Sequence, residues 1–433
     1  MKLLFFLLPV LASGQGFYWN TVSARSMGVG GVYLPSSTGV LDALAANPAG
    51  LTGIAAPTLD LSLSTIFSRG SFSNAVNTNA PLRTPVGAVP FAAFAMPLGK
   101  SRFSVGAGML PELLSVSDWR YVDGPGVAGA TYGMQRQKSA IVAARSTFGT
   151  AYAIHRRLSI GATAGFVYNS NRLLAPYIFQ SHPALAGLKT LLDLKTTGTG
   201  WNTSIGILAR PVDRLQLSVA WKSETSIDST GIATGNLQTQ LTAVGLGGAR
   251  PDFRYDASVR NVLPQSVMAG LSIKAHRKWL IGLQSNWIGW RNAFASLPVT
   301  LTHGNNADIN GLIGADSIFD RVPLHWKNQI SYRVGVEHQV AEGFLLRAGY
   351  AQANSAVPAS TLSPLTAAIL TRQYATGFGY QHHRIRFDAA YTVSPIASQS
   401  VPAGGSALRN GEYANSRVRI GLQGFTLNTS YQF

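Results

Sequence analysis

The feature that most constrains the fold is a regular alternation of apolar with polar or small residues along much of the chain. In the stretch 385–391, Ile385, Phe387 and Tyr391 lie on one face, whereas Arg386 and Asp388 lie on the other. Similar alternation recurs at 158–169, 330–337, 374–380 and 417–423. A period of two residues is the signal of a β-strand with two unlike faces. We therefore predict an all-β fold.

The N-terminus and the composition place these strands in a membrane. Lys2, the apolar stretch 3–11 and the small residues 12–14 have the form of a secretory signal peptide, predicted to cover residues 1–14. Its apolar run is too short to span a bilayer, which takes about 20 residues. No later stretch is an uninterrupted apolar run of that length, and only 12% of the residues are charged. These properties are typical of a transmembrane β-barrel of the bacterial outer membrane.

Turns and loops indicate the number of strands. Six short turns are expected near 99–100, 155–157, 211–214, 276–278, 340–343 and 382–384. Seven long segments alternate with them, near 69–85, 111–136, 171–199, 226–262, 292–326, 354–371 and 396–412. Short periplasmic turns that alternate with long extracellular loops predict an antiparallel barrel of about 14 strands. A soluble propeller or β-helix is the all-β alternative, but the chain shows no fixed repeat.

The alternation in the last strand changes phase. Arg417 and Arg419 share the polar face of the stretch 417–423, whereas Phe425 and Leu427 define the apolar face after Gly424. A phase change at a glycine is typical of a β-bulge. We therefore predict a bulge at Gly424, with both arginines facing the lumen.

Several other basic residues are assigned to the lumen by the same argument. A charge on the lipid face costs about 2–4 kcal/mol near the bilayer midplane, so an inward orientation is favoured. The candidate lumenal cations for ligand binding are Arg145, Arg333, Arg347, Arg386, Arg417 and Arg419, with Lys222 on the same face. An inward arginine can bind a carboxylate through paired hydrogen bonds. The alternative is that Glu337, Asp388 and Asp42 neutralise these cations inside the barrel.

Motifs for enzymes, cofactors and metals are missing from the sequence. The chain has no cysteine, no G-x-S-x-G or H-E-x-x-H motif and no complete phosphate loop. Gly28 and Gly30 begin a glycine-rich stretch, but Tyr33 stands where a dinucleotide fingerprint requires its third glycine. The net charge of +17 is scattered along the chain, which argues against nucleic-acid binding. We expect no cofactor; an adhesin or an outer-membrane lipid enzyme with dispersed residues is the alternative to a transporter.

The segment before the first strand carries a family resemblance. The stretch 24–31 followed by Asn47-Pro48-Ala49-Gly50-Leu51 resembles the N-terminal hatch of the FadL/TodX family of outer-membrane transporters. The stretches 200–211, 217–223, 263–290 and 326–350 are similar to further blocks of this family. The resemblance implies a hatch at residues 15–56 inside a barrel formed by residues 57–433.

The same resemblance implies a function. Members of the family admit hydrophobic compounds such as long-chain fatty acids by passive diffusion, with capture at the loops and lateral release at a kinked strand. Pro111 could break the third strand at such a kink, or it could merely begin a loop, because proline cannot donate to a strand ladder. Asn47, Pro48, Ala49 and Gly50 are candidate gate residues, but a rigid turn is the favoured interpretation of this segment.

Two extracellular segments contain apolar residues at helical spacing. Leu185, Leu188, Leu191 and Leu192 form the first set, with Pro183 in a predicted first helical turn, and Leu237, Leu241 and Val244 form the second. We predict two amphipathic helices whose apolar faces either capture an alkyl chain, at about 0.8 kcal/mol for each buried CH₂, or pack on each other as a lid.

The expected partners follow from this reading. They are a hydrophobic small molecule (a fatty acid or a hydrocarbon), outer-membrane lipid and lipopolysaccharide, and detergent in the binding site in vitro. The many basic residues favour a ligand that carries a carboxylate. We expect a monomer and no metal site.

Overall fold

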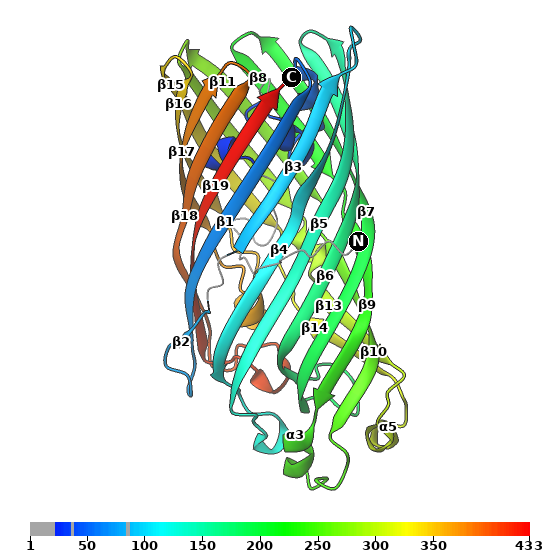
Figure 1. Ribbon diagram of the computed structural model, residues 1–433. Helices are drawn as coiled ribbons and strands as arrows, with labels where there is room; N and C mark the ends of the chain where they lie inside the picture. Colours follow the sequence, from blue (N-terminus) through cyan, green and yellow to red (C-terminus); the bar gives the residue numbers. More distant parts are fainter. Residues whose placement is uncertain (1–21, 36–38, 84–86) are drawn as a thin grey trace.

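The computed structural model describes residues 22–35, 39–83 and 87–433, so the predicted signal peptide lies outside the described residues. One antiparallel sheet of 19 segments closes on itself to form a tall barrel (Figure 1). The barrel closes where β1 pairs with β19 on one side and with β3 on the other. Thr58 therefore lies opposite both Gln432 and Ala95.

The strands have the following bounds: β1 (Thr58–Ser73), β2 (Ala80–Pro81), β3 (Gly87–Pro97), β4 (Phe103–Val122), β5 (Met134–His155), β6 (Leu158–Ile178), β7 (Lys189–Val212), β8 (Leu215–Lys222), β9 (Thr225–Asn236), β10 (Asp252–Leu263), β11 (Ser266–His276), β12 (Trp279–Ile288), β13 (Ser296–Thr302), β14 (Ile318–Pro323), β15 (Gln329–Ala341), β16 (Phe344–Ala353), β17 (Arg372–His382), β18 (Ile385–Val401) and β19 (Ser416–Gln432). Five wall strands are each divided in two, as β2–β3, β8–β9, β10–β11, β12–β13 and β14–β15. The segments thus build a closed barrel of 14 strands, which confirms the predicted fold class.

All six predicted short turns are confirmed, and they lie together at the upper end of the barrel in Figure 1. The predicted long loops were placed too widely. Most of the segment 171–199, for example, is paired strand, because β6 continues to Ile178 and β7 begins at Lys189. The strands extend beyond the apolar band, where their outer faces no longer need apolar residues, so the alternation that marks a strand fades while the ladder continues.

The predicted bulge at Gly424 is wrong. The pairing of β1 with β19 runs without a shift from Thr58↔Gln432 to Ser73↔Arg417. Val418 and Ile420 are buried on the inner face, whereas Arg417 and Arg419 are exposed on the outer face. What changes along β19 is the polarity of its two faces and not their phase. Arg417 and Arg419 are therefore not lumenal.

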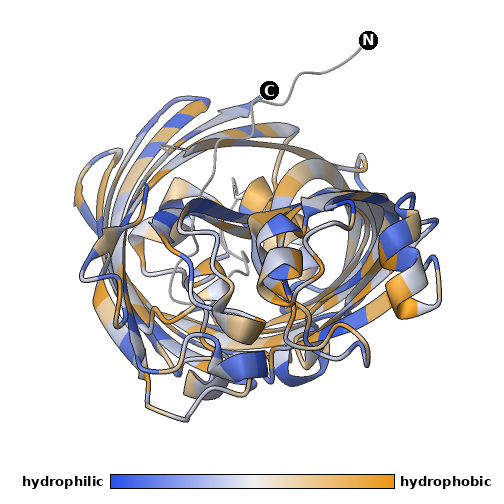
Figure 2. Ribbon diagram, turned by 90° about the horizontal axis from the view of Figure 1, so that it is seen from below, coloured by the Kyte–Doolittle hydropathy of each residue, from blue (hydrophilic) through white to orange (hydrophobic). Residues whose placement is uncertain are grey.

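Short helices occupy the lumen and the extracellular end. The N-terminal segment contributes α1 (Ala24–Gly28), α2 (Val40–Ala45) and the 3₁₀ helix η1 (Pro48–Gly53), which lie inside the barrel (Figure 1). The loops contribute η2 (Val127–Gly129), α3 (Gln238–Ala243), α4 (Trp290–Ala293), α5 (Ala307–Ile313), η3 (Ala359–Thr361), η4 (Pro364–Thr366) and η5 (Arg409–Gly411). Several of these segments cover the lumen when the barrel is seen from the loop end (Figure 2). No helix in the described residues is long and apolar enough to cross a membrane.

Candidate functional site

An apolar cavity of about 160 Å³ lies between the extracellular loops and the inner wall. Its apolar lining includes Leu173, Phe179, Leu192, Leu194, Val299 and Leu301, which come from β6, β7, β13 and the connection after β6. Leu365 in η4 and Leu408, directly before η5, also line the cavity. The cavity is on the extracellular side of the hatch, because the hatch contacts β5 and β6 further toward their short turn.

The polar groups of the cavity include two carboxylates, those of Asp320 and Glu412, and one arginine, Arg172. The Tyr177 hydroxyl donates to the Asp320 carboxylate at 2.5 Å, and the main-chain N–H of Gln180 donates to the same oxygen at 2.8 Å. Glu412 also lines the cavity and has no ion pair among the described residues. Burial raises the pKa of the Glu412 carboxyl to about 7; Lys189 opposes this shift, and Asp123 adds to it.

Two cations in or beside the cavity, Arg172 and Lys189, have carboxylate partners. Arg172 lines the cavity, but its guanidinium lies 3.4 Å from Asp193. The ammonium of Lys189 donates to Asp123 at 2.5 Å. Among the described residues, neither Asp320 nor Glu412 has a cationic partner, and the lining cation Arg172 is paired with Asp193.

The predicted capture residues have mixed positions. Leu192 lines the cavity. Leu185, Leu237 and Leu241 are buried in one hydrophobic cluster with the cavity residues Phe179, Leu194 and Leu301, and Leu188 packs against that cluster. Leu191 is half-buried and Val244 is exposed. Six of the seven candidates therefore lie outside the cavity lining, in an arrangement closer to the lid alternative.

The helix predicted around Leu185 is wrong. Residues 182–188 form turns, and Leu191 and Leu192 already belong to β7. The helix predicted around Leu241 is confirmed as α3. Most cavity residues were missed by sequence reasoning, among them Leu173 on β6, Leu194 on β7 and a set on β13 and β14 inside a predicted loop. The alternation of Leu297, Val299 and Leu301 was the signal that could have found the residues on β13.

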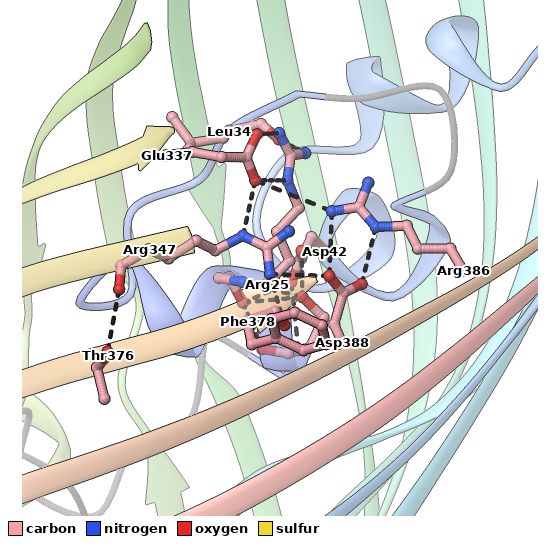
Figure 3. Close-up of polar contacts among 11 residues, drawn as sticks. Arg25, Leu34, Asp42, Glu337, Arg347, Thr376, Phe378, Arg386 and Asp388 are labelled. Carbon is pink, nitrogen blue, oxygen red and sulfur yellow. Dashed lines mark hydrogen bonds and ion pairs between the residues drawn. The ribbon is translucent and has the colours of Figure 1, made fainter. Parts of the chain in front are cut away.

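Four of the predicted lumenal arginines are buried inside the barrel, and none of them is among the described residues that line the cavity. Two of them, Arg347 and Arg386, belong to one ion cluster between the hatch and the wall (Figure 3). Arg25 of α1 binds both oxygens of Glu337 on β15 at 2.9 Å. Arg347 on β16 lies 2.7 Å from Glu337 and 2.8 Å from Asp388 on β18.

The other three buried arginines of the lumen, Arg386, Arg333 and Arg145, also have partners. Arg386 binds Asp388 at 2.9 Å, which completes a cluster of three arginines and two carboxylates. Arg333 donates to the carbonyl of Gly31 in the hatch. Arg145 lies 3.4 Å from Glu112 and donates to the hatch carbonyl of Leu44 at 3.2 Å. In the structure Glu337 and Asp388 neutralise Arg347 and Arg386, as the neutralisation alternative has it. Arg333 instead binds a hatch carbonyl, and Asp42 accepts from Ser23 and Ser26.

A bulge in β4 creates an irregularity in the wall. The register with β5 shifts between Pro111 and Leu113, and Glu112, the extra residue, contacts Arg145 and Lys222 in the lumen. Pro111 neither ends the strand nor begins a loop, because β4 continues to Val122.

On either side of the bulge, β4 lacks a neighbour on the β3 side. The β3–β4 ladder covers only Ala92↔Met109 to Pro97↔Ser104. From Leu110 to Ser117, β4 has no ladder partner on that side among the described residues. This part of β4 is buried at every position and is tied to the loop around η4, where Ser117 donates to the Leu365 carbonyl at 3.1 Å. We call the unpaired stretch between β3 and β4 the wall gap.

The glycine-rich part of the hatch packs directly on the wall. A Cβ atom at Gly349 would lie 2.1 Å from the backbone nitrogen of Gly30, and one at Gly335 would lie 2.3 Å from the carbonyl oxygen of Val29. Gly28 approaches Gly377 in the same way. The glycines on both sides therefore allow close backbone contact, which explains this stretch without any phosphate loop.

The candidate gate residues dock on the opposite wall. The Asn47 side chain caps η1 by accepting from Ala49 at 3.0 Å, and its amide donates to the Ile207 carbonyl at 3.0 Å. A Cβ atom at Gly206 would lie 2.0 Å from the Asn47 oxygen, and one at Gly161 would lie 2.5 Å from the Ala49 nitrogen. Pro48, Ala49 and Gly50 are buried in this contact. The hatch thus crosses the lumen from β15–β18 to β6–β8.

Comparisons with known proteins agree with this architecture. A family model described as outer membrane protein transport protein (OMPP1/FadL/TodX) matches residues 6–433. The chain is similar to the toluene transporter TodX of Pseudomonas putida, with a TM-score of 0.76, 19% identity and coverage of 97% of this chain and 100% of that chain.

Two further solved structures resemble the chain. The toluene transporter TbuX of Ralstonia pickettii gives a TM-score of 0.73 at 17% identity and coverage of 97% and 99%. A FadL homologue of Pseudomonas aeruginosa gives 0.73 at 17% identity and coverage of 96% and 100%. Among curated protein sequences, no match was found. At these identities the structural matches show the fold alone.

Proposed function

Because the chain belongs to the OMPP1/FadL/TodX family of outer-membrane transport proteins, we propose that it admits small, uncharged hydrophobic compounds by passive diffusion. As a family member it is a transport channel for hydrophobic compounds and not an enzyme, so the enzyme alternative is not retained. The finer proposal concerns the ligand class and the route, and the observation that carries it is the small apolar cavity with acidic polar groups.

The size and charge of the cavity support an uncharged ligand. A protein cavity of about 150 Å³ lined by Leu, Ile and Phe holds a benzene molecule, and this cavity of about 160 Å³ has a similar lining. A carboxylate ligand would meet Asp320 and Glu412, while the buried lumenal arginines are occupied elsewhere. This favours a hydrocarbon over the fatty acid that the basic composition suggested. TodX and TbuX, which share the fold, are toluene transporters.

The proposed route has three steps. The ligand is captured in the cavity beneath the extracellular loops, moves toward the hatch, and leaves sideways through the wall gap. The contact of β4 with the η4 loop supports this order, because Leu365 lines the cavity and also binds Ser117 beside the wall gap.

Uptake by whole cells tests the proposal. Leu301→Gln places a polar group in the cavity and should reduce uptake of labelled toluene several-fold, because an unpaired buried amide costs about 1–3 kcal/mol. Leu246→Gln is the matched control, since Leu246 is 42% exposed on a loop. Oleate uptake should be low and equal in both variants. Loss of oleate uptake with unchanged toluene uptake would overturn the ligand class, and unchanged uptake of toluene, alkanes and oleate on deletion of the chain would overturn transport.

A further inference from the structure

Arginines gather on the outer surface of the barrel where β1 meets β19. Arg69 on β1 and Arg417 and Arg419 on β19 are exposed at the loop end of these strands. Arg69 lies opposite Gly421 and is therefore the diagonal neighbour of Arg419, at the roughly 7–8 Å typical of such pairs. Arg83 is exposed just after β2, which pairs with the same end of β1. We call these four residues the arginine patch.

The arginine patch begins where the lipid-facing surface ends. On the side of the patch that faces the short turns, the outer surface of β1 and β19 is apolar, with Leu61, Leu63 and Leu427 all exposed. The rings of Phe67 and Phe425 then lie 6.2 Å apart, as an aromatic pair at the boundary. Arg69 follows Phe67 by two residues on the same face, which corresponds to about 7 Å along the strand. Aromatic residues mark the interface of a barrel with the headgroup region, so the patch lies at headgroup level.

The patch is not neutralised by the protein. No carboxylate forms an ion pair with any of its four arginines among the residues that the structure describes. The Arg417 guanidinium instead donates to the Ser400 hydroxyl at 3.2 Å. Among the other exposed arginines of the loop end, Arg136 pairs with Asp118 and Arg250 with Asp308. Arg120, Arg321 and Arg372 form no ion pair with the described residues, but they lie on strands other than β1 and β19 or their ends. Ser71 and Ser73, which lie opposite Arg419 and Arg417, leave room around the guanidinium groups.

From these observations we infer that the arginine patch binds the phosphate groups of a phosphorylated glycolipid of the outer leaflet. Guanidinium groups bind phosphate oxygens through paired, charge-assisted hydrogen bonds. The acyl chains of the same lipid would lie on the adjoining apolar surface of β1 and β19. A site of this kind matches both parts of the lipid, whereas free phosphate would use the arginines alone.

Native mass spectrometry of the purified full-length barrel with lipid A tests the inference. The triple variant R69Q/R417Q/R419Q should bind lipid A at least about tenfold more weakly, since each arginine removed takes charge-assisted hydrogen bonds with it. The matched control K100Q/K278Q/R384Q removes the same charge from exposed residues in the short turns and should bind as the wild type does. Retention of the native fold is checked in both variants by the change in electrophoretic mobility that heating causes in a folded barrel.

Two further binding measurements identify the chemistry of the ligand. Lipid A without its phosphates should bind the wild type as weakly as the phosphorylated lipid binds the triple variant. Inorganic phosphate at millimolar concentration should not displace lipid A. Equal lipid binding by the triple variant and the wild type, equal loss in the control, or displacement by inorganic phosphate would each overturn the inference.

Discussion

Glu412 shows how one residue can shape the chemistry of the cavity. Its carboxyl lines an apolar space in an extracellular loop, and burial raises its pKa to about 7. The raised pKa means that the carboxyl is largely uncharged below pH 7 and largely ionised above it. An ionised carboxylate beside an apolar ligand lacks the water that would stabilise its charge.

We predict that binding of an uncharged aromatic ligand weakens several-fold as the pH rises from 6 to 8. Isothermal titration of the detergent-solubilised protein with toluene across this range measures the effect. Glu412→Gln keeps the size of the side chain and removes its titration, so its affinity should stay constant. A wild type whose affinity is equally constant would contradict this role for Glu412.

Residue-level prediction from the sequence succeeded for the inward arginines and failed for the outward ones. Arg145, Arg333, Arg347 and Arg386 were assigned to the lumen because a charge cannot face lipid, and they are buried there. The same argument failed for Arg417 and Arg419, because the strand has already left the lipid at that level. A sequence does not state where the membrane ends, so the lipid argument was applied beyond its range.

At the level of the strand, β4 combines a bulge, a buried charge and an incomplete ladder. Glu112 is held by Arg145 and Lys222, and this contact keeps the bulged residue in the lumen. The following residues cannot continue the ladder with β3 and lie against the η4 loop. The wall gap, from Leu110 to Ser117, therefore includes the bulge, and a bulge turns the strand locally.

Filling the wall gap should block exit without removing the ligand site. Ser115 is fully buried on the part of β4 that lacks a β3 partner. Ser115→Trp should lower toluene uptake at least several-fold, at an overpacking cost of about 1–3 kcal/mol, while toluene binding in the cavity persists. Ser226→Trp, on the exposed face of β9, is the matched control. Normal uptake by a folded Ser115→Trp barrel would argue against exit through the wall gap.

The sequence predicted the strands better than the site, for a physical reason. A period of two reports that a strand has two different environments, and this holds wherever one face meets lipid. The cavity lies nearer the extracellular loops than the lipid-facing part of the wall does, and there strands such as β13 contact other protein segments. Its lining comes from segments far apart in the sequence. Leucines at helical spacing, such as Leu188 and Leu191, matched a helix by chance, although their segment enters β7.

For the molecule as a whole, the hatch connects two opposite sides of the barrel wall in addition to filling the lumen. Arg25 and the close backbone contacts of Gly28 and Gly30 attach the hatch to β15–β18. Asn47 attaches it to β6–β8. Both attachments are buried, so neither is weakened by salt in the way that a surface pair is. We therefore expect hatch movement to require the breaking of the ion cluster.

Removing Glu337 tests this attachment. Glu337→Gln leaves Arg25, Arg347 and Arg386 around a single carboxylate, and the loss of one partner of a buried pair costs about 3–5 kcal/mol. We predict frequent ion-conducting openings of the variant in planar bilayers, where the wild type stays closed. Glu342→Gln, in an exposed turn, should behave like the wild type. A closed Glu337→Gln channel would show that the glycine contacts hold the hatch unaided.

The position of the wall gap has a consequence for the thermodynamics of uptake. On the proposed route a solute passes the charged sugar layer inside the protein and re-emerges among acyl chains, without entering periplasmic water. The difference in chemical potential between the outside medium and the bilayer then supplies the whole driving force. The protein changes how fast the solute partitions and leaves the partition coefficient itself untouched. Accumulation inside the cell would consequently depend on whatever later step keeps the solute's activity in the membrane low.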